Sequence, residues 1–308
     1  MVKLPGDIDI KESSLRHRGN LLDILLLDQT TKKNIMWATD SYKQKGVGFG
    51  FENHIKPELV TGIYNKLIQP RASKSLSEQR QRTKEKAEVF TPRMIIKKIN
   101  NAIGEGQTVD MTNWREYVRE LKLEITCGEA PFIATRYNPT SNSKKLLKLK
   151  YRVGFLDKKL KIVTKFCVSP EDWLFWAKEA YKACYGYEWQ GDNILIAREN
   201  LLYTLNDFFK AKFKSGPPLK IQEEFAFIIS WNIFQMDGLK YVIPMSCHHE
   251  TRIKLGDLGL FWETPDTVEE YECEGCKYNR PTKHNGKYVK IMDWEKNKQM
   301  RFVDLLVI

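Results

Sequence analysis

Cysteine and histidine side chains, which are common zinc ligands, gather in one stretch of this 308-residue chain. Three of the six cysteines and three of the five histidines lie between residues 247 and 284. A Cys-His pair and a Cys-x-x-Cys element can supply four thiolate and imidazole ligands, and His249 and His284 are nearby. The predicted ligands of a structural zinc ion are Cys247, His248, Cys273 and Cys276. The alternative is a set of ordinary reduced thiols on a surface hairpin.

Residues suited to ligand binding also follow three predicted strands, which end near Gly128, Glu188 and Asp237. In open α/β sheets, ligands bind outside the carboxyl ends of the strands. Taken singly, a glycine after a strand is usually a turn, and an aspartate before glycine is usually a loop residue. The order and spacing of the three residues therefore carry the prediction of a binding site.

The elements that would position these residues alternate between strand and helix from about residue 91 to 240. This alternation predicts a parallel α/β sheet with helices on its faces. The predicted strands cover 121–126, 185–188 and a segment ending near 235–237. The predicted helices cover 92–103, a short segment after 113, 169–184, 193–213 and 219–229. The apolar run 21–27 fits either a strand or a buried helix turn.

Two stretches are strongly basic in a chain with a formal net charge of +11. Residues 71–98 hold nine basic and three acidic side chains, and residues 141–165 hold nine basic and one acidic. Alternating apolar residues in the second stretch predict a positively charged hairpin. A basic globular chain favours a polyanionic partner, most often nucleic acid, although a solvated helix face is the alternative. The predicted contacts to DNA phosphates are Arg80, Arg82, Lys84, Lys144, Lys145 and Lys148.

Composition and apolar runs argue against a disordered chain and against a membrane-spanning protein. Apolar residues make up 42% of the chain and aromatic residues 12%, which is enough for a folded core. The sequence has no apolar run of the ~18 residues needed to span a membrane, and residues 1–10 lack the apolar core of a signal peptide. We therefore expect a cytoplasmic protein with reduced cysteines.

Four segments resemble parts of the amino-group DNA methyltransferases. Residues 87–92 (AEVFTP) are similar to the segment that opens the catalytic domain of that family. Residues 123–132 (LEITCGEAPF), 185–200 (YGYEWQGDNILIAREN) and 232–239 (NIFQMDGL) are similar to its three cofactor motifs. The resemblance implies S-adenosylmethionine as the cofactor, with Glu188 at the ribose and Asp237 at the adenine amino group. The full implied set is Phe90, Thr91, Pro92, Glu124, Thr126, Gly128, Glu188 and Asp237.

The chain as a whole resembles the modification subunits of bacterial and phage type II restriction–modification systems. That family holds the flipped target base in an Asn/Asp/Ser-Pro-Pro-aromatic segment. The chain has one Pro-Pro pair, Pro217-Pro218, which follows Gly216 and precedes the third cofactor motif. The family would place its base-binding motif beyond Ile308. We therefore assign no catalytic residue and expect a second chain to supply this motif and target recognition.

These observations predict an α/β chain with a partial, Rossmann-like methyltransferase sheet. The predicted parts are a mixed N-terminal region with a basic linker (1–86), a cofactor-binding domain (87–241) and a C-terminal Cys/His insert (242–308). The predicted function is the cofactor-binding part of a DNA adenine-N6 methyltransferase of a restriction–modification system. The choice of adenine over cytosine rests on the family alone. The alternatives are a non-catalytic DNA-binding remnant of such an enzyme and, ranked below it, a restriction nuclease subunit.

Overall fold

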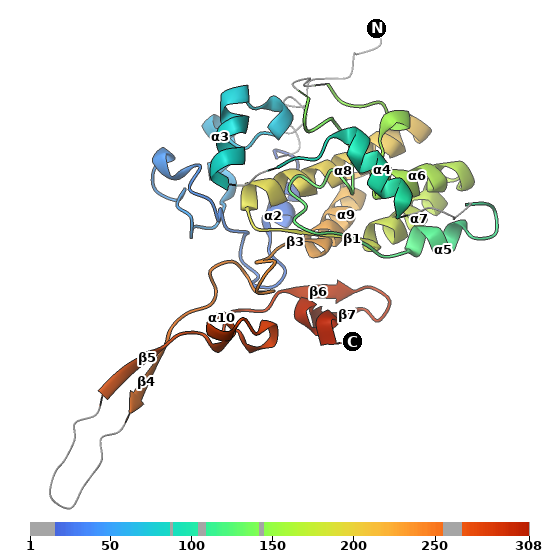
Figure 1. Ribbon diagram of the computed structural model, residues 1–308. Helices are drawn as coiled ribbons and strands as arrows, with labels where there is room; N and C mark the ends of the chain where they lie inside the picture. Colours follow the sequence, from blue (N-terminus) through green and yellow to red (C-terminus); the bar gives the residue numbers. More distant parts are fainter. Residues whose placement is uncertain (1–15, 87–88, 104–108, 142–144, 255–266, 308) are drawn as a thin grey trace, which may run out of the picture. The chain divides into compact units, whose positions relative to one another are not determined.

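A computed structural model describes residues 16–86, 89–103, 109–141, 145–254 and 267–307 of the chain (Figure 1). The fold is mixed α/β, as predicted, and divides into two units, Met1–Gln235 and Met236–Ile308. The first unit contains the whole predicted N-terminal region and nearly all of the predicted cofactor-binding domain.

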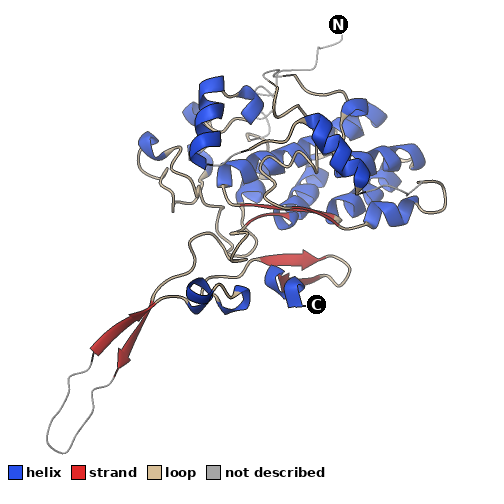
Figure 2. Cartoon of the chain, in the orientation of Figure 1, coloured by secondary structure: helices blue, strands red, loops and turns tan. Residues whose placement is uncertain are grey.

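The first unit is built on a three-stranded parallel sheet, drawn as red arrows in Figure 2. Its strands are β1 (Lys122–Glu124), β2 (Cys184–Glu188) and β3 (Ile233–Gln235). They are hydrogen-bonded in the order β1-β2-β3, so strands that follow one another in the chain are neighbours in the sheet. This order brings the carboxyl ends of all three strands to one edge.

Helices form both connections between the strands. The first connection holds α6 (Phe155–Phe166) and α7 (Pro170–Lys182), and the second holds α8 (Gly191–Phe213) and α9 (Leu219–Asn232). The start of α7 follows from local chemistry, because the Ser169 hydroxyl caps the helix by accepting a hydrogen bond from the Asp172 backbone N–H at 3.1 Å. The remaining α-helices described in this unit are α2 (Leu21–Leu26), α3 (Leu76–Lys86), α4 (Arg93–Ala102) and α5 (Trp114–Arg119).

The long helix α8 forms the centre of this unit and packs against β2, β3, α2, α6 and α9. The guanidinium of its fully buried Arg198 donates hydrogen bonds to the carbonyls of Leu25, Leu27, Ser230 and Ile233. These bonds satisfy carbonyls at the ends of α2 and α9. The apolar run 21–27 is helical over Leu21–Leu26, where all four leucines are buried, and Leu27 follows the helix in a β-bridge to Asn34.

The hairpin predicted over residues 141–165 is wrong. The described part of this stretch forms a short 3-10 turn (Leu149–Tyr151) followed by helix α6. Buried side chains recur at helical spacing in Phe155, Leu156, Leu160 and Val163. Asp157 fixes the helix start, because its Oδ2 accepts a hydrogen bond from the Gly154 backbone N–H at 3.1 Å.

The second unit is made of short elements. Strands β4 (Glu250–Lys254) and β5 (Thr267–Tyr271) form an antiparallel ribbon, and the short helix α10 (Glu274–Tyr278) follows. A second antiparallel pair joins β6 (Lys290–Asp293) to β7 (Lys298–Arg301), and a 3-10 segment covers Phe302–Val307. None of the helices in the described ranges has the length and apolar character needed to cross a membrane.

Candidate cofactor edge and candidate metal centre

The loop after β1 is held in a tight shape by one carboxyl group. Three residues of this loop adopt left-handed backbone conformations, with φ of 45° at Thr126, 53° at Gly128 and 58° at Ala130. The Glu124 carboxyl, at the end of β1, accepts hydrogen bonds from the backbone N–H groups of Phe132 (3.2 Å) and Ile133 (3.0 Å). Burial raises the pKa of Glu124 to about 8, against the effect of these two bonds, and the charge of Glu188 adds to the rise.

Glu188, at the end of β2, joins the same loop to the second strand. Its Oε2 accepts a hydrogen bond from the Gly128 backbone N–H at 2.9 Å, and its Oε1 accepts from the N–H groups of Trp189 (2.9 Å) and Gln190 (3.1 Å). Burial raises the pKa of Glu188 above its ordinary value despite these three donors. A carboxylate has about four acceptor positions, so one on Oε2 remains for a ligand hydroxyl.

The Phe90-Thr91-Pro92 segment lies against this loop. The Phe90 ring comes within 3.6 Å of the position that a Cβ on Gly128 would occupy, and the Arg71 guanidinium lies over the same ring at 4.8 Å. Pro92 caps the start of α4, and Thr91 is half-buried. Phe90, Gly128 and Glu188 are 38 or more residues apart in sequence in each case, yet they meet at one edge of the sheet.

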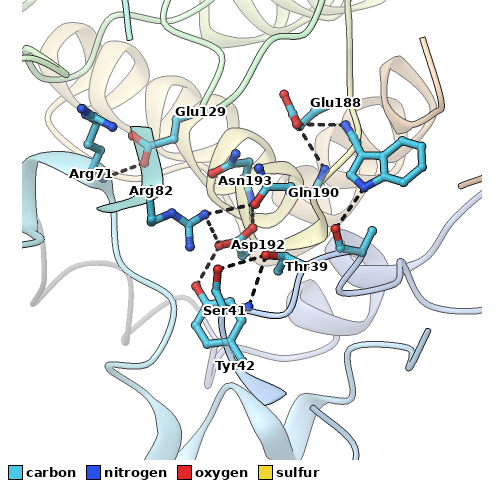
Figure 3. A network of polar contacts seen from close by, with 12 residues as sticks. Thr39, Ser41, Tyr42, Arg71, Arg82, Glu129, Glu188, Gln190, Asp192 and Asn193 are labelled. Atoms are coloured by element: carbon cyan, nitrogen blue, oxygen red, sulfur yellow. Dashed lines mark hydrogen bonds and ion pairs between the residues drawn. The ribbon is translucent and has the colours of Figure 1, made fainter. Parts of the chain in front are cut away.

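A buried ionic network continues from this edge (Figure 3). The Asp192 carboxylate, in the first turn of α8, pairs with the Arg82 guanidinium at 2.8 Å and accepts a hydrogen bond from the Tyr42 hydroxyl at 2.8 Å. Arg82 also donates to the Gln190 side chain at 3.3 Å. Burial alone would raise the pKa of Asp192, but the positive charges of Arg82 and Lys74 outweigh it and hold the pKa below its usual value.

The ammonium group of Lys74 stands out in this network. Lys74 is 7% exposed, and its Nζ has no hydrogen-bond partner within the part of the chain that the structure describes. An ammonium group removed from water without a hydrogen-bond acceptor is unfavourable. The neighbourhood of Asp192 therefore has an ammonium group without a hydrogen-bond acceptor among the described residues, and an anionic ligand group would supply one.

The predicted DNA contacts fall into three groups. Arg80, Lys84, Lys145 and Lys148 are exposed and can reach a phosphate. Lys144 lies outside the described residues. Arg82 does not fit its predicted role, because it is 6% exposed and its guanidinium is bound to Asp192. The sequence pattern of a basic helix did not reveal that one of its arginines faces inward.

Two residues of the predicted cofactor set stand apart from the contacts around Gly128. Thr126 is exposed, and within the described residues its side chain makes no hydrogen bond to this edge. Asp237 belongs to the second unit, where its Oδ1 accepts hydrogen bonds from the backbone N–H groups of Leu239 (3.0 Å) and Lys240 (3.2 Å). Asp237 therefore closes the turn that ends at its bridge partner Val242.

A compact cluster of cysteine and histidine side chains lies in the second unit. The Sγ atoms of Cys247, Cys273 and Cys276 and a ring nitrogen of His284 all lie within 4.8 Å of one another. The Nδ1 atom of His284 lies 3.6 Å from the sulfurs of Cys247 and Cys273 and 3.7 Å from that of Cys276. Three of the four predicted ligands are thus brought together.

The fourth member of the cluster is His284 and not the predicted His248. The His248 side chain is exposed, and its Nδ1 lies 3.4 Å from the Ser246 carbonyl. Its backbone pairs instead with the Asn285 side chain through two hydrogen bonds of 3.2 and 2.8 Å. His284 was visible in the sequence as a histidine shortly after the Cys-x-x-Cys element, but spacing alone did not select it over His248.

Sequence reasoning also did not identify Asp192, the partner of Arg82, or Tyr42, whose hydroxyl donates a hydrogen bond to Asp192. Asp192 lies in the first turn of a helix, where acidic residues are common in any case, so its type gave no sign of a buried ion pair. The three cysteines outside the cluster, Cys127, Cys167 and Cys184, are buried free thiols.

Comparison of this chain with protein-family models, with curated proteins and with solved structures gives no match. The assignment of function therefore depends on the geometry described above.

Proposed function

We propose that this chain is the S-adenosylmethionine-binding part of an amino-group DNA methyltransferase from a restriction–modification system. The proposal places the cofactor at the carboxyl edge of the β1-β2-β3 sheet. The methionine part would lie near Phe90-Thr91-Pro92 and the ribose near Glu188. The chemistry would be transfer of the cofactor's methyl group to an exocyclic amine of a DNA base.

One observation carries the proposal, namely the meeting of three distant segments at Gly128. The loop glycine donates its N–H to Glu188, and the Phe90 ring packs beside it. Each of these residues belongs to a different segment that resembles the methyltransferase family. A chance resemblance in sequence would have no reason to bring all three to one point, outside the strand ends where α/β proteins bind ligands.

The charges at this edge also suit the cofactor. S-adenosylmethionine carries a sulfonium and an ammonium group, both positive, together with one carboxylate. Glu188 supplies an acidic group on the side of the loop, and the buried ammonium of Lys74 next to Asp192 supplies a positive one. Such a mixed set of charges favours a zwitterionic ligand over a simple anion.

DNA and a second polypeptide are the proposed partners. The exposed basic residues Arg80, Lys84, Lys145 and Lys148 would contact phosphates, which bind without reading sequence. The sequence contains no Asn/Asp/Ser-Pro-Pro-aromatic segment that could hold a flipped base. A second chain would therefore supply base binding and target recognition, and the complex would act in the cytoplasm.

A second candidate function is a DNA-binding protein that has kept the fold without the cofactor. The observation that favours it is the engagement of Glu124 and Glu188 by backbone N–H groups, which stabilise both carboxyls without any ligand.

Calorimetric titration of S-adenosylmethionine into the full chain separates the two functions. The proposal predicts saturable binding of about one cofactor per chain, weakened by about tenfold or more (~1.4 kcal/mol) in Phe90→Ala. Phe175→Ala is the matched control, because Phe175 is an exposed phenylalanine of α7 in the same unit. Absence of binding to the folded wild-type chain would reject the cofactor and leave the DNA-binding protein. Equal binding by both variants would reject the proposed location.

A further inference from the structure

The second unit holds four soft donor atoms that the proposed function does not use. We propose that Cys247, Cys273, Cys276 and His284 bind one Zn²⁺ ion in a closed structural site. The three cysteines would bind as thiolates, and the histidine would bind through Nδ1. This inference is independent of the proposed cofactor site, since it uses only residues of the second unit.

The distances between the donor atoms fit a tetrahedral ion. With Zn–S distances of about 2.3 Å and Zn–N distances of about 2.0–2.1 Å, tetrahedral geometry separates sulfur from nitrogen by about 3.6 Å. The three sulfur–nitrogen distances in the cluster are 3.6, 3.6 and 3.7 Å. The three sulfur–nitrogen distances in the cluster therefore match those of a tetrahedral zinc coordination shell.

Hydrogen bonding alone explains this arrangement poorly. In its neutral form, the His284 ring offers a single acceptor nitrogen, and a thiol is a weak donor. At most one of the three thiols can donate to Nδ1, so the other two would approach the ring without a bond of their own. A cation at the centre satisfies all four lone pairs together.

The residues around the cluster support the same interpretation. The Asn285 backbone N–H donates to the Cys273 sulfur at 3.3 Å, a contact that stabilises a thiolate. The Lys240 ammonium interacts electrostatically with Cys276 and Cys247, and its positive charge would offset the net negative charge of three thiolates on a divalent ion. Outer contacts of this kind orient the ligands of a metal site.

Gly275 shows how closely the ligand loops approach one another. A Cβ at this position would lie 2.6 Å from the His284 backbone nitrogen and 2.6 Å from its Nδ1. Gly275, the second of the two residues between the cysteines of the Cys-x-x-Cys element, therefore leaves space for the histidine.

The site lies at the base of the β4–β5 ribbon. Cys247 comes three residues before Glu250, Cys273 comes two residues after Tyr271, and Glu250 pairs with Tyr271 in the ribbon. A two-stranded ribbon is marginally stable by itself in water. A zinc ion would hold its two strands together at this end and attach helix α10 to them. Because all four positions are protein ligands, the ion would be structural and not catalytic.

Elemental analysis of the purified full chain tests the site. We expect about one zinc per chain in the wild type and in His248→Ala, and a loss of at least tenfold in His284→Ala. The two histidine variants are matched, since His248 is the neighbouring histidine whose ring lies outside the cluster. Equal zinc content in both variants, or loss in His248→Ala only, would overturn the ligand assignment.

A second measurement uses only the wild-type chain, so it does not depend on whether a variant folds. In the wild-type chain, chelation should lower hydrogen-exchange protection in β4 and β5 while leaving the protection of α8 unchanged. Exchange of zinc for cobalt should then produce the absorption of a tetrahedral, thiolate-bound ion. A wild-type chain without zinc that also shows no cobalt absorption would overturn the proposal, as would ribbon protection that chelation does not change.

Discussion

The two candidate sites satisfy their polar groups in opposite ways. At the sheet edge of the first unit, Glu124 and Glu188 accept hydrogen bonds from backbone N–H groups of the loops that follow β1 and β2, and Asp192 is paired with Arg82. In the cluster of the second unit, three sulfurs and one imidazole nitrogen face one another. Carboxylates and N–H donors complement each other without a ligand, whereas four lone-pair donors do not.

This difference decides how directly each site reveals its ligand. The distances in the cysteine–histidine cluster suit one four-coordinate cation, so the ligand class that we propose there is inferred from geometry. The ligand that we propose for the sheet edge is inferred instead from the segments that meet there and from Lys74, whose Nζ has no hydrogen-bond partner among the described residues. Three predictions test this difference.

The largest effect is expected from Arg82→Ala. Removing the guanidinium leaves the Asp192 carboxylate fully buried without its ionic partner, which should lower the free energy of unfolding by about 3–5 kcal/mol. Arg80→Ala, an exposed change on the same helix, should alter it by no more than about 0.5 kcal/mol. Urea denaturation of both variants measures the difference. Similar free energies of unfolding in the two variants would mean that the ion pair between Arg82 and Asp192 does not stabilise the folded chain.

A smaller effect is expected from Gly275→Ala in the metal cluster. The added methyl group would force His284 away from the sulfurs, and zinc affinity should fall by about 10–100-fold, the range seen when residues around a metal site are disturbed. Gly216→Ala is the control, because a Cβ there meets no atom within 4 Å. Competition with a chromophoric chelator gives both affinities. An unchanged affinity in Gly275→Ala would contradict the close packing of the ligand loops.

A third prediction concerns the pH dependence of stability at Glu124. The pKa of this carboxyl is raised in the folded chain from about 4.5 to about 8, so the folded state binds its proton more tightly than the unfolded state. Its contribution to stability is complete below about pH 4.5 and is lost as the pH rises toward 8. Glu124→Gln should therefore flatten the decline of stability over this range, whatever its effect on absolute stability.

Thermal unfolding of Glu124→Gln between pH 5 and 8 measures this slope, with Glu58→Gln at an exposed position of the same unit as control. The control should keep the wild-type slope. If Glu124→Gln also keeps it, the carboxyl is ionised throughout the range, and the burial described above does not govern its titration.

Much of the fold could be predicted from local patterns. The three parallel strands and the helices α7, α8 and α9 follow from apolar periodicity and capping residues such as Ser169. Residues 155–166 show where this reasoning fails. Their apolar positions fit both an alternating and a helical pattern, and the helix is selected by the Asp157 cap and by packing against α7 and α8.

The kind of site could be predicted from the sequence more completely than the individual residues that form it. Cys247, Cys273 and Cys276 could be identified because a Cys-x-x-Cys element has few other uses, but the choice between His248 and His284 depends on how the loops fold back. The inward orientation of the Arg82 side chain could likewise not be predicted, since its partner Asp192 lies 110 residues further along the chain. Pairings over such separations are set by tertiary packing, which one sequence does not reveal.

X-ray absorption at the zinc edge of the purified wild-type chain measures directly whether the facing donor atoms of the second unit form a closed metal site. We predict a four-coordinate ion with three sulfur ligands at about 2.3 Å and one nitrogen at about 2.0–2.1 Å. A zinc ion bound only by oxygen and nitrogen, or a folded chain that takes up no zinc, would contradict it.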